Sequence, residues 1–320
     1  MLDVAGATPK PSNPQVESNG GLRPSSGPEV NAGGSVCAVI VSYNPSSAVL
    51  KNIAALRTQV GSIVVVDNGS SHEHLAMLRN GRSQCGFELI ENGSNLGIAV
   101  ALNVGVREGK AKGCSWVVLF DQDSSVEPGF IHLMLTTIEN APNPSQIGIV
   151  CPVYLDTNTG VIFPVQRSKT GEVLSAMTSG SLIPVKVFER IGSFDESLFM
   201  DYVYIEFCLR SRRAGYSIVQ SPRAVLYHSL GRITRHRLLG RWFGSTNHSA
   251  ARRYYITRNR LWVLWQFLRD WSWSPKETRS VIAETVKILL VERDRLAKLK
   301  SIMLGFTDAL RGRMGKRLDL

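Results

Sequence analysis

The chain is poor in cysteine and has no apolar stretch long enough to cross a membrane. Its five cysteines among 320 residues are widely spaced, and none form a Cys-x-x-Cys pair. Neither a disulfide framework nor a zinc site is therefore expected. The longest apolar stretch, residues 261–268, is far shorter than the roughly 20 residues of a membrane-spanning helix. We expect a cytoplasmic protein with reduced thiols.

Large apolar residues are also scarce at the beginning of the chain. Residues 1–35 are rich in Pro, Gly, Ser and Asn, and cannot bury enough surface to offset the entropy of ordering. This segment also lacks a charged start followed by an apolar core, so we do not expect a signal peptide. The composition predicts a disordered tail over residues 1–35.

Positive charge is unevenly distributed. The net charge is +11 overall, but residues 1–206 carry 13 Lys and Arg against 19 Asp and Glu, a balance of −6, whereas residues 207–320 carry 24 against 7, a balance of +17. A basic region interleaved with aromatic residues suits nucleic acid, an anionic membrane surface or a phosphorylated substrate. Because the first part is acidic, we expect no nucleic-acid partner, whereas peripheral contact with the inner face of the plasma membrane stays open.

Two apolar runs, residues 36–42 and 63–66, predict buried strands joined by a helix over residues 50–60. Strand, helix and strand at this spacing form a βαβ unit with a parallel sheet. Asp67 and Asn68 follow the second run, where their side-chain oxygens can accept the N3–H of a pyrimidine base. A plain turn explains the same residues.

Small residues mark the start of the next predicted helix. A third short strand is expected over residues 87–90, and residues 95–103 open the helix. The segment from Asn95 to Gly97 allows close approach of the backbone to a phosphate at the helix N-terminus. Close packing of the helix on the sheet requires the same small residues.

Two carboxylates, Asp121 and Asp123, follow a further apolar run over residues 116–120. Ligands of open α/β sheets bind at the carboxyl ends of the strands, and carboxylates there suit a hard divalent cation that holds a diphosphate. A solvated acidic turn is the alternative explanation.

Two later segments each have two interpretations. Ser179 and Gly180 lie in a predicted strand that lines the acceptor side of the pocket, or Gly180 marks a strand bulge. A helix beginning near Arg252 carries Leu261, Leu264, Trp265 and Leu268 on its expected apolar face. The tryptophans at 262, 265, 271 and 273 suit a membrane interface, and packing of this helix against the preceding domain is the alternative.

Several motifs occur together in one order: residues 41–44, 66–70, 95–97, 121–124, 192–196, 198–203 and 227–231. With these motifs, the chain from residue 36 to about residue 260 resembles the inverting family 2 glycosyltransferases of the GT-A fold, and among them the bacterial rhamnosyltransferases. The resemblance implies an α/β domain with a Rossmann-like mixed sheet over residues 36–250. A helical, basic and aromatic extension over residues 251–320 is expected to follow it.

The resemblance also implies residue roles. The nucleotide sugar is expected to contact Tyr43, Asn44, Asp67, Asn95, Gly97 and Asp121. Asp123 is expected to be the principal ligand of a divalent cation, Mg²⁺ or Mn²⁺, and His228 to lie near the cation or the diphosphate. A structural role is the alternative for His228.

The implied reaction moves L-rhamnose from dTDP-L-rhamnose to a saccharide or lipid-linked acceptor. Another nucleotide-sugar donor, a nucleotidyltransferase of similar sheet, and a non-catalytic scaffold that binds sugar nucleotides or membranes are the alternatives.

At the position of the general base, this chain differs from the rhamnosyltransferases that it resembles. They carry an Asp at the position of Tyr204, and a phenol with a pKa near 10 is a poor base at neutral pH. Either Asp201 or Glu206 takes this role, and we favour Asp201, or the site is weakened and neither carboxylate serves as the base. Both carboxylates also suit helix capping and compensation of the helix dipole.

Overall fold

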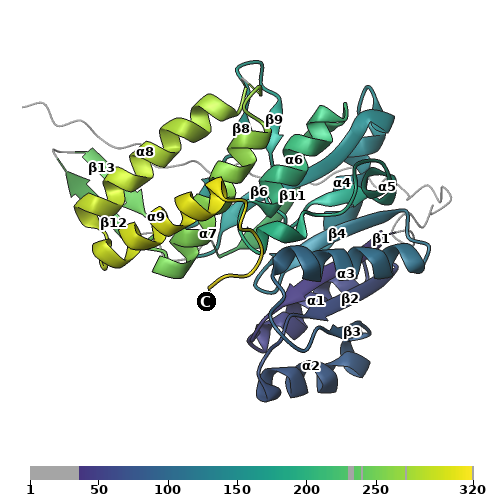
Figure 1. Cartoon of the computed structure of the whole chain (residues 1–320). Coiled ribbons are helices and arrows are strands. Elements are labelled where there is room, and N and C mark those ends of the chain that lie inside the picture. Colours follow the sequence, from purple (N-terminus) through teal and green to yellow (C-terminus); the bar gives the residue numbers. More distant parts are fainter. Residues whose placement is uncertain (1–35, 230–233, 239–240, 271, 319–320) are drawn as a thin grey trace, which may run out of the picture. The chain divides into compact units, whose positions relative to one another are not determined.

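The computed structural model describes residues 36–229, 234–238, 241–270 and 272–318. The tail predicted over residues 1–35 and the tryptophan at 271 lie outside the described residues. The described chain forms a nine-stranded mixed sheet in the order β3-β2-β1-β4-β10-β6-β11-β5, with β7 paired to β6 (Figure 1).

The first half of the sheet is parallel and follows the predicted βαβ pattern. Its elements are β1 (Val36–Ser42), α1 (Ala48–Arg57), β2 (Ser62–Asp67), α2 (His72–Cys85), β3 (Glu88–Glu91), α3 (Ile98–Ala111) and β4 (Trp116–Asp121). β1 lies between β2 and β4 and is parallel to both. All seven residues of β1 are buried, as expected for a central parallel strand covered on both faces.

The second half adds antiparallel strands. In chain order it contains β5 (Ser125–Val126), α4 (Phe130–Glu139), β6 (Ile147–Asp156), β7 (Ile162–Phe163), β10 (Leu182–Pro184), α5 (Val185–Ile191), α6 (Val203–Arg213) and β11 (Ser217–His228). Between β7 and β10, β8 (Gln166–Arg167) and β9 (Val173–Ser175) pair with each other in a separate two-stranded sheet. β10 joins the two halves because it pairs antiparallel with both β4 and β6. The result is the expected mixed α/β sheet.

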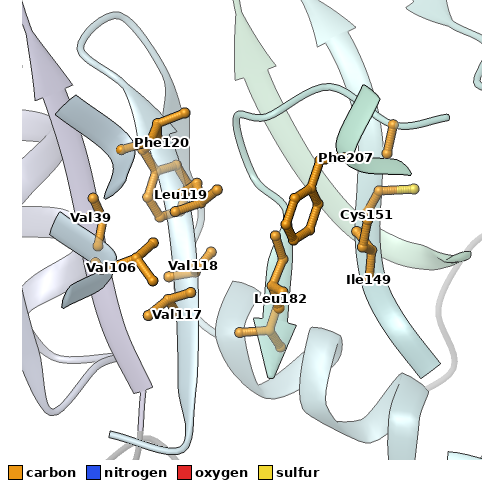
Figure 2. Close-up of a cluster of buried hydrophobic side chains, with 14 of the residues drawn as sticks. Val39, Val106, Val117, Val118, Leu119, Phe120, Ile149, Cys151, Leu182 and Phe207 are labelled. Atoms are coloured by element: carbon orange, nitrogen blue, oxygen red, sulfur yellow. The ribbon is translucent and has the colours of Figure 1, made fainter. Parts of the chain in front are cut away.

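The core is continuous across this junction. Figure 2 shows side chains of β1, β4 and α3 together with side chains of β6, β10 and α6, all members of one buried cluster. Phe207 on α6 and Cys151 on β6 are both at most 2% exposed. The antiparallel strand therefore extends the hydrophobic layer of the parallel half, and the sheet packs as one unit.

The strand predicted around Ser179 and Gly180 is wrong, because both residues lie in a turn between β9 and β10. Gly180 has φ +78°, a conformation that favours glycine. Its N–H donates to the Leu119 carbonyl at 2.7 Å, so the turn is anchored to β4.

The C-terminal part consists of a hairpin and three helices: β12 (Thr234–Leu238), β13 (Arg241–Ser245), α7 (Ala250–Gln266), α8 (Ser274–Val291) and α9 (Arg295–Leu310). α7 packs on α9 at Gly305, where a Cβ atom would lie 2.6 Å from the Tyr254 carbonyl oxygen. The expected helical extension is therefore present. None of the described helices is long and apolar enough to span a membrane.

The buried face of α7 differs from the expected apolar face. Trp265 and Leu268 are 62% and 59% exposed, whereas Arg258 and Asn259 are fully buried. Trp273 is also fully buried, so the tryptophans do not form one exposed belt. α7 buries polar groups because backbone carbonyls of residues 197–201 face it and accept their hydrogen bonds.

Candidate active site

Strand pairing brings the predicted polar loops to one edge of the sheet. β1, β2 and β4 end together, since Ser42 pairs with Asp67 and Val41 with Asp121. β11 ends at His228, and β5 pairs with it in antiparallel register immediately after the Asp123 loop. A histidine more than 100 positions away in sequence is thus brought beside the two carboxylates.

Asp121, Asp123 and His228 form a cluster that can hold a metal ion. One ligand atom from each residue lies within 4.8 Å of those of the other two. His228 Nδ1 lies 3.3 Å from Asp123 Oδ1 and shares a hydrogen bond of 2.9 Å with Ser124 Oγ. Asp123 is the most exposed of the three, so it faces the open side of the site.

The three side chains of the cluster shift one another's pKa values. Burial raises the pKa of Asp121, the charge of Asp123 raises it further, and His228 opposes the shift. Burial alone would lower the pKa of His228, but the carboxylates of Asp123, Asp121 and Asp156 outweigh it and raise that pKa above its usual value. Crowded carboxylates of this kind favour a bound cation.

The cluster opens into a cavity of about 700 Å³, within the usual range of small-molecule sites. Seven of the predicted site residues line this cavity: Tyr43, Asn95, Gly97, Asp121, Asp123, Asp201 and His228. The other predicted residues are not among its described lining: Asn44, Asp67, Ser179, Gly180 and Glu206.

Gln122 holds Tyr43 beside the carboxylates. The Tyr43 N–H donates to Gln122 Oε1 at 2.7 Å, and Gln122 Nε2 donates back to the Tyr43 carbonyl at 3.2 Å. The Tyr43 side chain is 45% exposed in the cavity wall. An exposed aromatic ring in this position offers a surface for stacking a base.

Asp67 ends β2, and Asn44 lies in the loop after β1. Asp67 is 1% exposed, and its carboxylate accepts hydrogen bonds from the N–H groups of Gly69 and Ser70 at 3.1 and 3.0 Å. Asn44 Oδ1 accepts from the Ser71 N–H at 2.8 Å. The two residues shape the loops at the sheet edge, and direct contact with the base stays a prediction.

Ser179 forms hydrogen bonds that orient the cluster. Its Oγ accepts the Asp121 N–H at 3.1 Å and shares a hydrogen bond of 2.7 Å with Ser124 Oγ. Ser124 in turn contacts His228, so one buried chain of hydroxyls orients the cluster. The role of Ser179 and Gly180 on the acceptor side stays a prediction.

Gly97 sits where the chain passes close to the loop before α6. Its φ is +91°, and a Cβ atom there would lie 2.4 Å from the Phe199 carbonyl oxygen. Asn95 Oδ1 accepts from both the Gly97 N–H and Asn68 Nδ2, at 3.0 and 3.1 Å. Glycine is therefore required by the backbone geometry, whatever its role toward a phosphate.

The segment that carries Asp201 has an unusual backbone. Phe199, Asp201 and Tyr202 all have positive φ, between 54° and 63°, each costing on the order of 1–3 kcal/mol. The side-chain amide of the buried Asn259 on α7 donates to three carbonyls of this segment, those of Leu198, Met200 and Asp201, at 2.7, 2.6 and 3.1 Å. The C-terminal part thus holds this segment in a conformation that it would not adopt alone.

The two carboxylates considered for the base have different surroundings. Asp201 lines the cavity and receives two hydrogen bonds from Arg252, at 3.1 and 3.0 Å. Glu206 is 4% exposed, and both of its oxygens accept from Arg210 at 2.8 Å. Arg210 also donates to the Ser193 carbonyl at 2.8 Å, so the Glu206 carboxylate is part of a structural network outside the described cavity lining.

Tyr204 lines the cavity next to Asp201. Burial raises its pKa above the usual value near 10, and the charges of Asp201 and Glu277 raise it further. Tyr204 therefore stays a neutral phenol that can donate or accept a hydrogen bond but not serve as a base at neutral pH.

Residues after β11 complete the wall, and sequence reasoning missed them. Thr246, His248 and Arg252 all line the cavity. Burial lowers the pKa of His248 to about 4, and the positive charges of Arg252 and Arg253 contribute, so its imidazole is neutral near pH 7. The basic composition around Arg252 was the only sequence signal, and it did not indicate which side chain faces the pocket.

Comparisons with known proteins agree with this geometry. The sequence profile of glycosyl transferase family 2 matches residues 37–191. The dTDP-rhamnosyl transferase RfbF of Shigella flexneri is 29% identical over 302 residues, which cover 88% of this chain and 97% of that protein. The low-salt glycan biosynthesis hexosyltransferase Agl10 of Haloferax volcanii is 31% identical over 202 residues, 57% of this chain and 63% of that protein.

Two solved structures share the fold at low sequence identity. The mannosyltransferase PcManGT of Pyrobaculum calidifontis, in complex with GDP-Man and Mn²⁺, has a TM-score of 0.53 at 16% identity, covering 89% of this chain and 76% of that one. TarS 1–349 of Staphylococcus aureus, in complex with UDP-GlcNAc, has a TM-score of 0.55 at 14% identity, covering 86% and 80%. These similarities confirm the predicted GT-A type of mixed α/β fold.

Proposed function

We propose that the donor of this chain, a glycosyltransferase that uses a nucleotide sugar, is dTDP-L-rhamnose. The chain matches the profile of glycosyl transferase family 2 over residues 37–191. It transfers the rhamnose to a saccharide or lipid-linked acceptor with inversion at the anomeric carbon. The donor assignment is supported by the similarity to the dTDP-rhamnosyl transferase RfbF along 97% of that protein.

The observation that carries the proposal is the convergence of Asp121, Asp123 and His228 at the carboxyl edge of the sheet, in the wall of the large cavity. Two carboxylates and one imidazole form a donor set that suits Mn²⁺ and, less well, Mg²⁺. The residues therefore fit a divalent cation. Such a cation supplies positive charge to the departing nucleoside diphosphate.

Other residues of the chain bind the donor and accept the proton of the acceptor hydroxyl. Tyr43 stacks on the base, and Asn95 with Gly97 lies along the donor at the start of α3. The acceptor hydroxyl lies on the side of Asp201, which takes its proton as the hydroxyl attacks the sugar carbon. Arg252 fixes the orientation of the Asp201 carboxylate through its two hydrogen bonds.

A donor panel tests this proposal. Purified protein with Mn²⁺ or Mg²⁺ is incubated with dTDP-, UDP- and GDP-sugars, and release of the nucleoside diphosphate is measured. We expect the highest turnover with dTDP-L-rhamnose. Preference for another nucleotide sugar would move the assignment to that donor, and binding without release from any donor would favour a non-catalytic scaffold.

The cation site has its own variant pair. Asp123→Ala should abolish cation-dependent turnover and leave the fold intact, because it removes the carboxylate proposed as the principal ligand of the cation. Glu127→Ala, which removes an exposed carboxylate four residues away, is the matched control and should behave as the unmodified protein. Unchanged metal dependence in Asp123→Ala would refute the site.

A further inference from the structure

Two smaller cavities follow the active-site cavity, each sharing wall residues with the one before it. The first, of about 250 Å³, shares four wall residues with it: Asp201, Tyr204, Thr246 and His248. The second, of about 180 Å³, lies between α7, α8 and α9 and shares four wall residues with the first: Arg253, Ile256, Arg260 and Glu284. The three cavities therefore follow one another from the proposed base toward the C-terminal helices.

The walls of the two smaller cavities differ in polarity, and the wall of the middle cavity is charged. The middle cavity is lined by Asp201, Arg253, Arg260, Glu277 and Glu284, among others. Arginine and carboxylate charges there are nearly balanced, and they pair with one another, as in the contacts of Arg260 with Glu284 at 3.1 and 3.2 Å. A wall with both donors and acceptors suits the hydroxyl groups of a neutral sugar, whereas the acidic residues disfavour phosphate.

One donor in this wall has no hydrogen-bond partner among the described residues. It is Nε of Arg253, whose side chain is 5% exposed and borders both smaller cavities. A buried donor without a partner is costly, so native structures usually supply an acceptor. The Nε atom is itself closed off from both cavities, so this donor identifies no ligand contact.

The last cavity is mostly apolar. Aliphatic, thioether and aromatic side chains make up most of its wall: Ile256, Leu261, Val281, Ile288, Ile302, Met303 and Phe306. Its volume is close to that of cavities of about 150 Å³ that hold a benzene-sized molecule. It therefore admits a narrow hydrocarbon chain.

The outer surface of α8 and α9 continues this apolar character. Exposed large apolar side chains recur along both helices: Ile282, Val286, Leu289, Leu290, Leu296, Met303, Leu304, Phe306 and Leu310. On α8 they follow the spacing of one helix face. A hydrocarbon chain that leaves the cleft thus meets further apolar surface in the most basic third of the sequence.

We propose that the cleft between α7, α8 and α9 binds the hydrocarbon tail of an amphiphilic glycoside, whose sugar end lies in the middle cavity and points toward Asp201. This inference rests on the proposed transferase function only in identifying that glycoside as the acceptor. It selects the lipid-linked acceptor over a free saccharide.

The test measures binding of alkyl glucosides that differ only in tail length, from methyl to octyl, by calorimetry on the full chain below the micelle concentration. Each methylene buried in the cleft should tighten Kd about fourfold, until the cleft is filled. Equal affinity for the methyl and octyl compounds would overturn the proposal.

A matched pair of variants locates the tail. Met303→Asp introduces a charge into the cleft wall, whereas Leu310→Asp makes the same kind of change on α9 at a residue outside the described wall. The two side chains are 61% and 62% exposed, so both variants should fold. Met303→Asp should abolish the dependence on tail length, and Leu310→Asp should retain it.

A second wall variant, Phe306→Asp, should behave as Met303→Asp. Equal losses in the wall variants and in Leu310→Asp would mean adhesion to the general surface and would refute the cleft. Melting curves of each variant confirm that the comparison is made on folded protein.

Turnover separates this inference from the function on which it rests. Release of dTDP from dTDP-L-rhamnose at equal KM for short- and long-tailed acceptors would refute the tail site while supporting the transferase. Tail-dependent binding without release of nucleotide from any donor would retain the binding site and refute the transferase.

Discussion

The carboxylates of Asp201 and Glu206 should give opposite results when each is replaced by its amide. Asp201→Asn removes the proposed base, and loss of a general base lowers turnover by about 10²- to 10⁴-fold. Its pairing with Arg252 is partly exposed, with side chains 17% and 43% accessible, so the loss of stability should be about 1 kcal/mol or less. The affinity for the donor should remain unchanged.

Glu206→Gln should affect stability instead. The Glu206 side chain is 5% exposed and accepts two hydrogen bonds from Arg210, which is 25% exposed. Hydrogen bonds to charged groups contribute about 1.5–3 kcal/mol, and the remaining carbonyl partners of Arg210 retain part of the network. We expect a loss of about 2 kcal/mol and, at about 2–4 °C for each kcal/mol, a fall in Tm of several degrees.

Two measurements on each variant decide between these roles. Nucleoside diphosphate release is followed at saturating donor, well below Tm, and Tm is measured by calorimetry. Turnover near that of the unmodified protein in Asp201→Asn, together with collapse in Glu206→Gln without unfolding, would refute the assignment. Near-normal turnover in both variants would exclude both carboxylates as the base.

Gly97→Ala should reduce both Tm and turnover, because its Cβ would collide with the Phe199 carbonyl oxygen at 2.4 Å and α3 would have to shift; an unchanged Tm would contradict this packing. Asp67→Ala should raise KM for the donor more than it lowers kcat, since Asp67 shapes a loop remote from the reacting carbon; a loss confined to kcat would exclude this role. The folded pKa of His248, about 4, lies below its usual value of 6.5, so the unfolded chain binds its proton first and this contribution to stability is lost as pH falls from about 6.5 toward 4. Urea unfolding at several pH values should show that the free energy of unfolding decreases as pH falls over this range. In His248→Asn this decrease should be smaller. The protein should bind vesicles that contain anionic lipid and sediment with them at low salt, because the apolar face of α8 and α9 lies in a basic region. Added salt should release it, and absence of co-sedimentation at low salt would exclude this contact.

Local sequence patterns determined the parallel half of the fold and the position of the first carboxylates. The runs that became β1, β2 and β4 are continuously apolar because both faces of these strands are buried, and such a pattern can be read over a few residues. The ends of these strands could therefore be located, and with them Asp67, Asp121 and Asp123. The motifs of the family added the order of the later segments.

Contacts between distant segments were decided only by the tertiary structure. His228 reaches the carboxylates because β5 pairs with the end of β11, and no local pattern encodes that register. Asp201 faces the cavity while Glu206 pairs with Arg210, although only five positions separate them in the sequence. Asp201 lies in the segment before α6 that Asn259 holds, whereas Glu206 lies in the first turn of α6. The polar face of α7 has the same origin, since a buried polar helix face forms only where another segment supplies its hydrogen-bond partners.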